Sequence, residues 1–243
     1  MERLQKRIAS LGYCSRRKAE ELITKGLVEV NGEVVTKLGT TVKKGDVITV
    51  EGNILDNSKA YEYYLLNKPK GVVTTTNDEK GRKTVVDLID TKTRIYPVGR
   101  LDYDTTGALI LTNDGELANM LMSPSSQVDK TYIAKVEGEV TIPSIQALRK
   151  GVMIDGRKTG KARVKLKSID KKKNTSLVEL TIHEGRNHQV KKMFEVLGYK
   201  VTKLRREKYA NLNLKGLMPG EYRSLSVKEV KILYSLCKKQ DTN

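Results

Sequence analysis

The segment YPVGRLDYDTTGALILTNDG, residues 96–115, contains the pattern on which both fold and function depend. A polar loop with two carboxylates and two threonines runs into a hydrophobic strand predicted over residues 108–112, which ends in an Asn-Asp-Gly turn. Catalytic side chains are often carried by loops that rigid strands hold in place. From the residues alone, the pattern indicates either a functional carboxylate or a turn in which Asp102 and Asp104 act as caps.

Residues 61–237 are expected to form a large domain around this strand. Short apolar runs predict strands, and longer runs with helical periodicity predict helices. The further strands are predicted at residues 63–69, 72–76, 131–136, 162–169 and 176–182, and the helices at 116–122, 142–150, 187–197 and 227–235. Because strands dominate and neighbouring ones can pair, we expect a mixed, largely antiparallel α+β domain.

Residues 1–58 are expected to form a separate small domain of two helices and a small sheet. Leu4, Ile8 and Leu11 lie on one stripe of a first helix. Ser15 is a suitable N-cap for a second helix over residues 16–25. The dipeptide Asn31-Gly32 predicts a type I′ turn between two short strands, and the polar residues 53–60 predict a linker.

The charge balance indicates a polyanionic partner. The chain has 46 Lys and Arg against 29 Asp and Glu, a formal net charge of +17. Nucleic acid is the first candidate, because each neutralised phosphate releases counterions, and an anionic membrane surface is the second. No run approaches the ~18–20 apolar residues of a membrane span. A charged N-terminus and two distant cysteines, Cys14 and Cys237, favour a cytoplasmic protein without disulfides.

Several common chemistries have no motif in this sequence. The two histidines, His183 and His188, do not have the spacing of a zinc-binding HExxH helix, and the cysteines cannot complete a metal set. A phosphate-binding loop, a dinucleotide fingerprint and a GxSxG elbow are also missing from the sequence. An enzyme built from this chain is therefore expected to use carboxylates, Tyr, Lys or Arg, with neither a metal nor a cofactor.

The N-terminal pattern RLQKRIASLGYCSRRKAEELITKGLVEVNG, residues 3–32, resembles the small RNA-binding domain named after ribosomal small-subunit protein four. The resemblance implies that the basic helices, including Arg16 and Arg17, face RNA phosphates. Without the resemblance, these charges are equally well interpreted as an ordinary solvated helix surface.

The segment GRLDYDTTGALILTNDGELANMLMSPSSQVDKTY, residues 99–132, resembles the pseudouridine synthases that act on ribosomal RNA as single proteins. Four further blocks agree in the same order: LLNKPKGVVTT, KTYIAKVEG, IHEGRNHQVKKMFEVLGYKVTKLRR and LMPGEYRSL. Within that family, the patterns ELAN.LM.P and EGRNHQV are more similar to the branch acting on 23S than to the branch acting on 16S ribosomal RNA. Two lysines, Lys191 and Lys192, stand where the family often has arginines.

The resemblance also implies the roles of individual residues. Asp102 would be the essential carboxylate, either attacking C1′ of the ribose or removing a proton from C2′. Arg186 would pair with Asp102 and stabilise its charge, and Tyr132 would stack on the uracil and relay a proton. Outside the resemblance, Arg186 is one more phosphate-facing cation, Tyr132 a core residue, and Asp104 an equal candidate for Asp102.

A second group of residues is expected to contact the substrate. The target nucleotide must leave the helix stack or already be unpaired. Leu204 would form an apolar wall of the uracil pocket, unless it is simply core, and Arg100 would fill the space left by the base. The further residues expected to bind RNA are Lys68, Lys191, Arg16 and Arg17.

The sequence therefore predicts a monomeric, cofactor-free enzyme that isomerises one uridine of 23S ribosomal RNA. Two alternatives stay open: the same chemistry on 16S ribosomal RNA, and a non-catalytic RNA-binding factor in ribosome assembly. The presence of Asp102, Tyr132 and Arg186 together argues against the second alternative, because a protein that only binds RNA does not need them.

Overall fold

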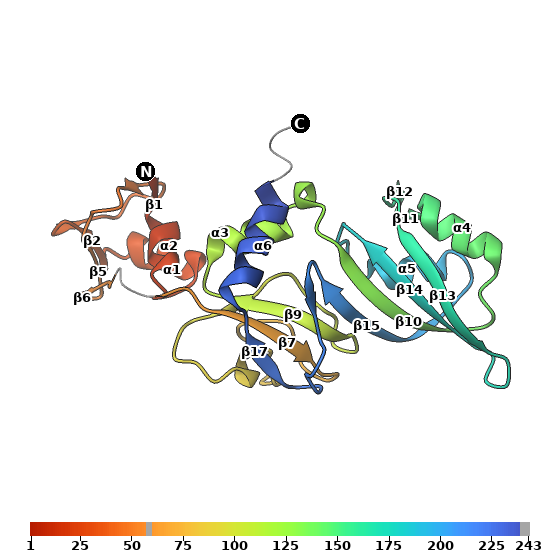
Figure 1. Cartoon of the computed structure of the whole chain (residues 1–243). Coiled ribbons are helices and arrows are strands. Elements are labelled where there is room, and N and C mark those ends of the chain that lie inside the picture. The colour runs from red at the N-terminus through yellow and green to blue at the C-terminus, as the bar shows by residue number, and fades with distance from the viewer. Residues whose placement is uncertain (57–59, 239–243) are drawn as a thin grey trace. The chain divides into compact units, whose positions relative to one another are not determined.

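The structure, a computed structural model, describes residues 1–56 and 60–238 and divides into two compact units (Figure 1). The boundary expected at residue 58 lies outside the described residues. The first unit comprises Met1–Glu62, Thr91–Arg94 and Asn113–Gly115, and the second comprises Tyr63–Asp90, Ile95–Thr112 and the chain from Glu116 onward. No helix in the described ranges is long and apolar enough to cross a membrane.

In the first unit, two helices pack on a small sheet, as the sequence predicts. The helices are α1, Leu4–Ser10, and α2, Arg16–Thr24. The Ser15 hydroxyl caps α2 by accepting a hydrogen bond of 3.1 Å from a backbone N–H of its first turn. The predicted type I′ turn is confirmed, because Asn31 and Gly32 both have positive φ angles, of 54° and 85°.

The first unit contains more strands than the sequence predicts. Its four-stranded sheet has the order β3-β2-β5-β6, and β1 pairs separately with β4. The linker predicted from residue 53 is wrong at its start: Glu51 and Gly52, both at positive φ, turn the chain back so that β6 pairs with β5. The strands are β1 Glu2–Arg3, β2 Val28–Val30, β3 Glu33–Val34, β4 Thr41–Val42, β5 Ile48–Val50 and β6 Asn53–Ile54.

The second unit is built on one mixed, largely antiparallel sheet, which confirms the predicted fold class. Its strand order is β13-β14-β10-β15-β9-β7-β17, with β16 beside β15 and β8 beside β9. The pairing of β15 with β9 is parallel. The strands are β7 Tyr63–Lys68, β8 Tyr96–Pro97, β9 Thr106–Thr112, β10 Lys130–Glu137, β13 Arg163–Asp170, β14 Thr175–Ile182, β15 Val201–Tyr209, β16 Leu212–Asn213 and β17 Tyr222–Ser224.

Residues 72–76 and the strand β15 differ from the sequence-based expectation, as do short strands such as β8, β16 and β17. Residues 72–76 do not form the predicted strand. Val73 makes one isolated bridge to Thr84, and the side chains of Val72 and Thr74 are buried although they lie in a loop. Conversely, β15 was not among the predicted strands. Its central residues alternate buried Leu204 and Arg206 with solvent-facing charged side chains, so a charged residue occupies a core position and hides the period-two pattern.

Helices pack on the sheet and form two separate apolar clusters with it. Within β9, Leu109 and Leu111 join one cluster, whereas Ala108 and Ile110 join the other, so this strand is buried on both faces. The first cluster includes side chains of α4 and α5; the second includes side chains of α3 and α6, which lie over the β7 and β9 half of the sheet in Figure 1. The helices are α3 Gly115–Met122, α4 Ile142–Lys150, α5 Gln189–Glu195 and α6 Val227–Lys238, with short 3-10 turns at Val86–Leu88 and Pro124–Ser126 and a hairpin of β11 Met153–Ile154 and β12 Arg157–Lys158.

Candidate active site

The loop before β9 holds Asp102 by its backbone on both sides. Leu101 is buried in the core, and its carbonyl accepts a hydrogen bond of 2.7 Å from the Thr74 hydroxyl. The carbonyl of Asp102 itself accepts the N–H of Thr105 at 3.1 Å. The Asp102 side chain nevertheless remains 31% exposed. The loop therefore presents an accessible carboxylate from a fixed backbone.

Lys68, at the end of β7, anchors the same loop from inside. Its ammonium donates hydrogen bonds to the carbonyls of Pro69, Asp102 and Thr105 at 3.1, 3.1 and 3.0 Å. Burial lowers the pKa of Lys68 to about 8, against the opposing effect of the carboxylates of Asp102 and Asp104. The predicted contact of Lys68 with RNA is contradicted, because this side chain is 0% exposed and its donors are used within the protein.

The cation beside Asp102 is Lys191, on the first turn of α5. Its ammonium lies 3.1 Å from Asp102 Oδ2 and 2.7 Å from Asp104 Oδ1. Burial lowers the pKa of Lys191, but the hydrogen bonds with Asp104 and Asp102 outweigh burial and raise it overall. The hydrogen bond from Lys191 also lowers the pKa of Asp104. Lys191 therefore carries a firm positive charge between the two carboxylates.

His188 contributes a second nitrogen near the same carboxylate. It precedes α5 in the left-handed conformation, with φ of 53°, and its Nε2 lies 3.4 Å from Asp102 Oδ1. Half of this side chain is exposed. In the sequence, the spacing of His188 only excludes a zinc-binding HExxH helix, and no spacing rule points to its place beside Asp102.

Arg186 does not pair with Asp102 as the resemblance implied. Its guanidinium donates to the carbonyl of Ile154 at 2.6 Å, of Arg157 at 3.0 Å and of Lys158 at 3.3 Å. These carbonyls belong to the β11–β12 hairpin and take up the guanidinium donors. The reason is local: Arg186 precedes α5, whereas the first turn of α5 places Lys191 beside the Asp102 loop.

Tyr132 and Leu204 lie in the cluster that also contains Leu101. Both are 8% exposed, Tyr132 on β10 and Leu204 on the neighbouring strand β15. The side chains of both face the same apolar layer as α5. The structure thus brings Tyr132 and Leu204 into the cluster that contains Leu101, the neighbour of Asp102, while Arg100 is exposed on the same loop as Asp102.

Arg206 is a buried arginine near the site, and the sequence did not single it out. Arg206 is 2% exposed, its Nε donates to the carbonyl of Ala108 at 2.6 Å, and its guanidinium lies 5.1 Å from the Tyr209 ring centroid. It sits where β15 meets β9, opposite Gly107. In the sequence, Arg206 is one of several neighbouring basic residues, and no pattern marks it as buried.

The two arginines expected to bind RNA in the first unit lie on α2. Arg16 and Arg17 are both exposed, directly after the capping residue Ser15. Their guanidinium groups are therefore accessible to a ligand.

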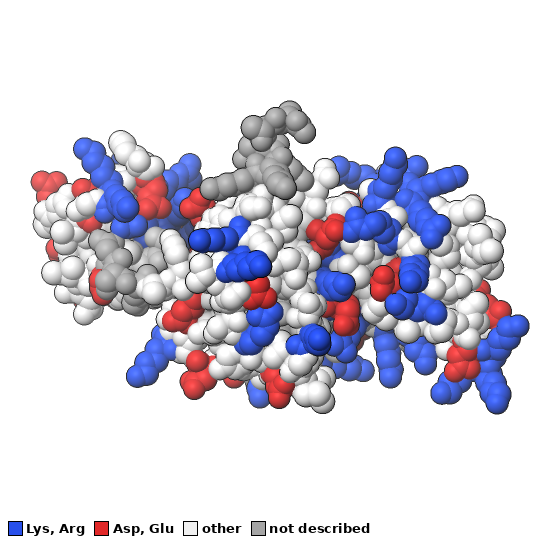
Figure 2. Space-filling model, viewed as in Figure 1, with Lys and Arg blue, Asp and Glu red and all other residues white. Residues whose placement is uncertain are grey.

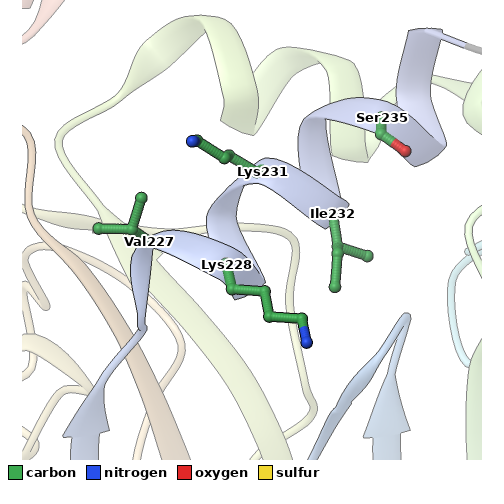
Figure 3. Close-up of a pocket in the computed structure, with 5 residues that line it drawn as sticks. All are labelled: Val227, Lys228, Lys231, Ile232 and Ser235. Atoms are coloured by element: carbon green, nitrogen blue, oxygen red, sulfur yellow. The ribbon is translucent and has the colours of Figure 1, made fainter.

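A shallow hollow of about 600 Å³ lies on α6 and contains none of the predicted site residues (Figure 3). It is lined by Val227, Lys228, Lys231, Ile232 and Ser235. Elsewhere among the described residues, no group of three or more His, Cys, Asp or Glu side chains is arranged to hold a metal ion.

Comparison with known proteins identifies the two parts of the chain. Residues 62–196 match the family of RNA pseudouridylate synthases, which covers more than half of the chain. The chain belongs to this family. Residues 2–48 match the S4 domain, in agreement with the N-terminal resemblance. The Asp102 loop and the helix that carries Lys191 both fall within the synthase match.

Relatives resemble the chain over almost its whole length. It is 54% identical to the ribosomal large subunit pseudouridine synthase B of Bacillus subtilis, covering 97% of each chain. It is 37% identical to the dual-specificity RNA pseudouridine synthase RluF of Escherichia coli, covering 96% of this chain and 79% of the relative. A crystal structure of a pseudouridylate synthase superposes with a TM-score of 0.68 at 34% identity, covering 96% of this chain and 100% of the other.

Proposed function

We propose that this enzyme isomerises a uridine of 23S ribosomal RNA to pseudouridine, with Asp102 as its catalytic residue. The observation that carries the catalytic part is the anchored, accessible Asp102 carboxylate with the Lys191 ammonium 3.1 Å away. The choice of ribosomal RNA rests on the large-subunit synthase from Bacillus subtilis, which is 54% identical over 97% of the chain.

The reaction suits a site made of side chains alone. The N1–C1′ bond of the uridine breaks, the uracil turns, C5 joins C1′, and the proton from C5 is balanced by protonation at N1. Asp102 either attacks C1′ or removes a proton from C2′, and both routes need the ionised carboxylate. The Lys191 ammonium contacts this carboxylate at 3.1 Å.

The surrounding residues are proposed to hold the flipped nucleotide. Tyr132 and Leu204 would line the uracil pocket, and Arg100 would occupy the gap that the base leaves in its stack. Arg186 would keep the β11–β12 hairpin in place by donating hydrogen bonds to three of its backbone carbonyls. We propose this role for Arg186 in place of the ion pair with Asp102.

The N-terminal domain is proposed to bind the ribosomal RNA by its phosphates. Arg16 and Arg17 are exposed on α2 within the part that matches the S4 domain. Guanidinium groups bind phosphate oxygens strongly, and such contacts position a protein on RNA without reading its sequence. We place this domain at residues 1–58 and the catalytic domain at residues 61–237.

Chemical mapping of pseudouridine in ribosomal RNA tests the proposal. The RNA is isolated from cells with and without the gene, and from cells in which Asp102→Asn replaces the enzyme. One site in 23S RNA should disappear in both deficient strains. Loss of a site only in 16S RNA would contradict the target, and an unchanged map in both RNAs would contradict the proposed reaction on ribosomal RNA.

A further inference from the structure

One face of the antiparallel half of the sheet is left without a covering layer by the described residues. On β10, Tyr132, Ala134 and Val136 point into the core cluster that α4 and α5 complete. The alternate side chains therefore point to the opposite face. Ile133 on β10 and Leu177 on β14 lie on that face, and neither belongs to an apolar cluster.

Basic side chains crowd this uncovered face. The register places Lys135 directly opposite Lys203, with Arg205 opposite Ile133 and Lys208 opposite Thr131. In Figure 2, Lys and Arg side chains also outnumber acidic ones over this part of the molecule. The basic residues of the face are Lys135 on β10, Arg163, Lys165 and Lys167 on β13, and Lys203, Arg205 and Lys208 on β15.

The acidic side chains neutralise only part of this charge. Glu179 pairs with Lys167 at 3.6 Å, Glu207 pairs with Arg205 at 3.1 Å, and Asp129 pairs with Arg163. Four lysines have no ion-pair partner in the parts of the chain that the structure describes: Lys135, Lys165, Lys203 and Lys208.

The Lys135–Lys203 pair works against folding. Like charges directly opposite each other on paired strands destabilise a sheet, yet here they sit side by side with further lysines around them. A bound polyanion removes that repulsion and releases its own counterions. The arrangement thus fits a ligand with closely spaced negative charges.

We propose that this face, formed by Lys135, Lys165, Lys203 and Lys208, binds the phosphate backbone of a double-helical segment of the substrate RNA. The face offers no aromatic ring from β10, β13, β14 or β15 on which an unpaired base could stack. Double-helical RNA, by contrast, is recognised mainly by its shape and its phosphates. The inference rests on the proposed function for the identity of the RNA.

The surface is distinct from the catalytic loop. Lys191 and His188, which contact Asp102, belong to the start of α5, and α5 packs on the opposite, covered face. The RNA double helix bound on the lysine face is therefore a different part of the substrate from the flipped nucleotide. It would hold the substrate while the catalytic loop acts on a single residue.

The test uses the full-length protein and a short blunt-ended RNA duplex without unpaired nucleotides, with binding measured by fluorescence anisotropy over a range of salt concentrations. One variant combines Lys135→Gln, Lys165→Gln, Lys203→Gln and Lys208→Gln. A control of equal net charge, built from exposed lysines outside this face, combines Lys80→Gln, Lys83→Gln, Lys150→Gln and Lys215→Gln.

We expect the face variant to lose roughly tenfold or more in duplex affinity, and the magnitude of its log–log salt slope to fall by about 3.6, as for four lost phosphate contacts. The control should lose less than about threefold. Equal losses in both variants, or none in the face variant, would overturn the proposal. Because the duplex carries no target nucleotide, this result does not depend on isomerisation.

Two further probes distinguish other ligands. If the face variant loses binding to a single-stranded oligoadenylate but keeps the duplex, the surface serves unpaired RNA and the proposal is wrong. If the face variant loses only binding to a polyglutamate peptide, the partner is an acidic protein, and the proposal is again wrong. Thermal unfolding followed by circular dichroism should show a midpoint no lower than that of the parent, because the substitutions remove the Lys135–Lys203 repulsion.

Discussion

Lys191 places its ammonium 3.1 Å from the carboxylate of Asp102. The same ammonium lies 2.7 Å from Asp104, so one cation contacts two acidic side chains of the Asp102 loop. The two carboxylates differ in exposure: the Asp104 side chain is 56% exposed and the Asp102 side chain is 31% exposed. The more enclosed of the two also has the second contact, to His188.

The two carboxylates should therefore respond differently to amide substitution. Asp102→Asn is expected to lower kcat by roughly 10³-fold or more while RNA affinity stays within a few fold. Asp104→Asn should retain substantial activity, since Lys191 keeps its contact with Asp102. Single-turnover assays and filter binding on the same RNA separate the two effects. Equal loss of kcat in both variants would contradict the assignment of Asp102.

The role of Lys191 can be compared directly with that of Arg186. Lys191→Met removes the cation beside Asp102 and should lower kcat by roughly ten- to a hundredfold. Arg186→Met removes hydrogen bonds to the β11–β12 hairpin and should mainly lower the thermal midpoint and raise KM. Lys191→Arg, which keeps the charge, should recover most of the activity. A larger kcat loss in Arg186→Met than in Lys191→Met would reverse the two assignments.

Gly107 is expected to tolerate no side chain. Its φ is +111°, and a Cβ would lie 2.8 Å from the backbone nitrogen of Arg206 and still closer to its carbonyl oxygen. The obstacle is backbone and cannot rotate away, so Gly107→Ala should reduce the free energy of unfolding by roughly 2–4 kcal/mol. Urea denaturation measures this, with Gly99→Ala as the control: Gly99 also has a positive φ, of 75°, but no atoms lie within 4 Å of its Cβ position. Equal costs at the two positions would show that φ strain, and not the contact with Arg206, sets the effect.

The start of α6 predicts a stability change in acid. Ser226 and Glu229 form a reciprocal capping box, and Glu229 also receives two hydrogen bonds from Arg223 at 2.9 and 2.6 Å. The hydrogen bonds from Arg223 are the main cause that lowers the Glu229 pKa from 4.5 to about 2. Because the folded pKa is the lower one, this stabilisation is complete above pH 4.5 and is lost as the pH falls towards 2.

Glu229→Gln should therefore lower stability at neutral pH by about 1 kcal/mol and remove this part of the acid dependence. Denaturation curves at neutral pH and at pH 3 provide the comparison. Glu116→Gln, on the first turn of α3, is a matched change at another helix start. If Glu229→Gln and the parent lose the same stability between the two pH values, the capping box does not have the proposed effect.

Lys68 predicts a second rise in stability with pH, in the alkaline range. Its folded pKa of about 8 lies below the ordinary 10.5, so between these values the folded protein binds fewer protons than the unfolded chain. Stability from this group therefore rises with pH across that window. Activity should fall over the same window, because a neutral amine has one donor fewer for the carbonyls of Pro69, Asp102 and Thr105.

The measurement compares urea unfolding at pH 8 and pH 10 in the parent and in Lys68→Met. The parent should gain more stability than the variant over this interval, and the difference isolates Lys68 from other lysines. Nitrogen NMR of the Lys68 ammonium provides an independent reading of the same pKa. A titration near 10.5 would contradict the predicted shift.

The parts of the fold that could be predicted are those where sequence pattern and burial agree. α4 was predicted at its observed bounds, because Ile145 and Leu148 face the core and Thr141 caps its start. β9 was found from its continuous apolar run. β15 was not, because Arg206 occupies one of its core positions and exposed lysines surround it.

The site shows a similar division between chemistry and geometry. The resemblance placed Arg186 beside Asp102, whereas in the structure the Lys191 ammonium lies there. That difference depends on the residue at which α5 begins and on His188 adopting a left-handed conformation. The sequence also could not show that the Lys68 side chain points into the protein. Nothing in the motif around Lys68 indicates the three backbone carbonyls that accept its hydrogen bonds.

The position of β9 between two apolar clusters has a consequence for local opening of the enzyme. Amide hydrogens exchange with solvent most slowly where opening a strand requires disruption of the packing on both faces, and β9 meets that condition along most of its length. The Asp102 loop leads directly into this strand. The Asp102 carboxylate is thus tethered to a segment that opens only when most of the domain unfolds.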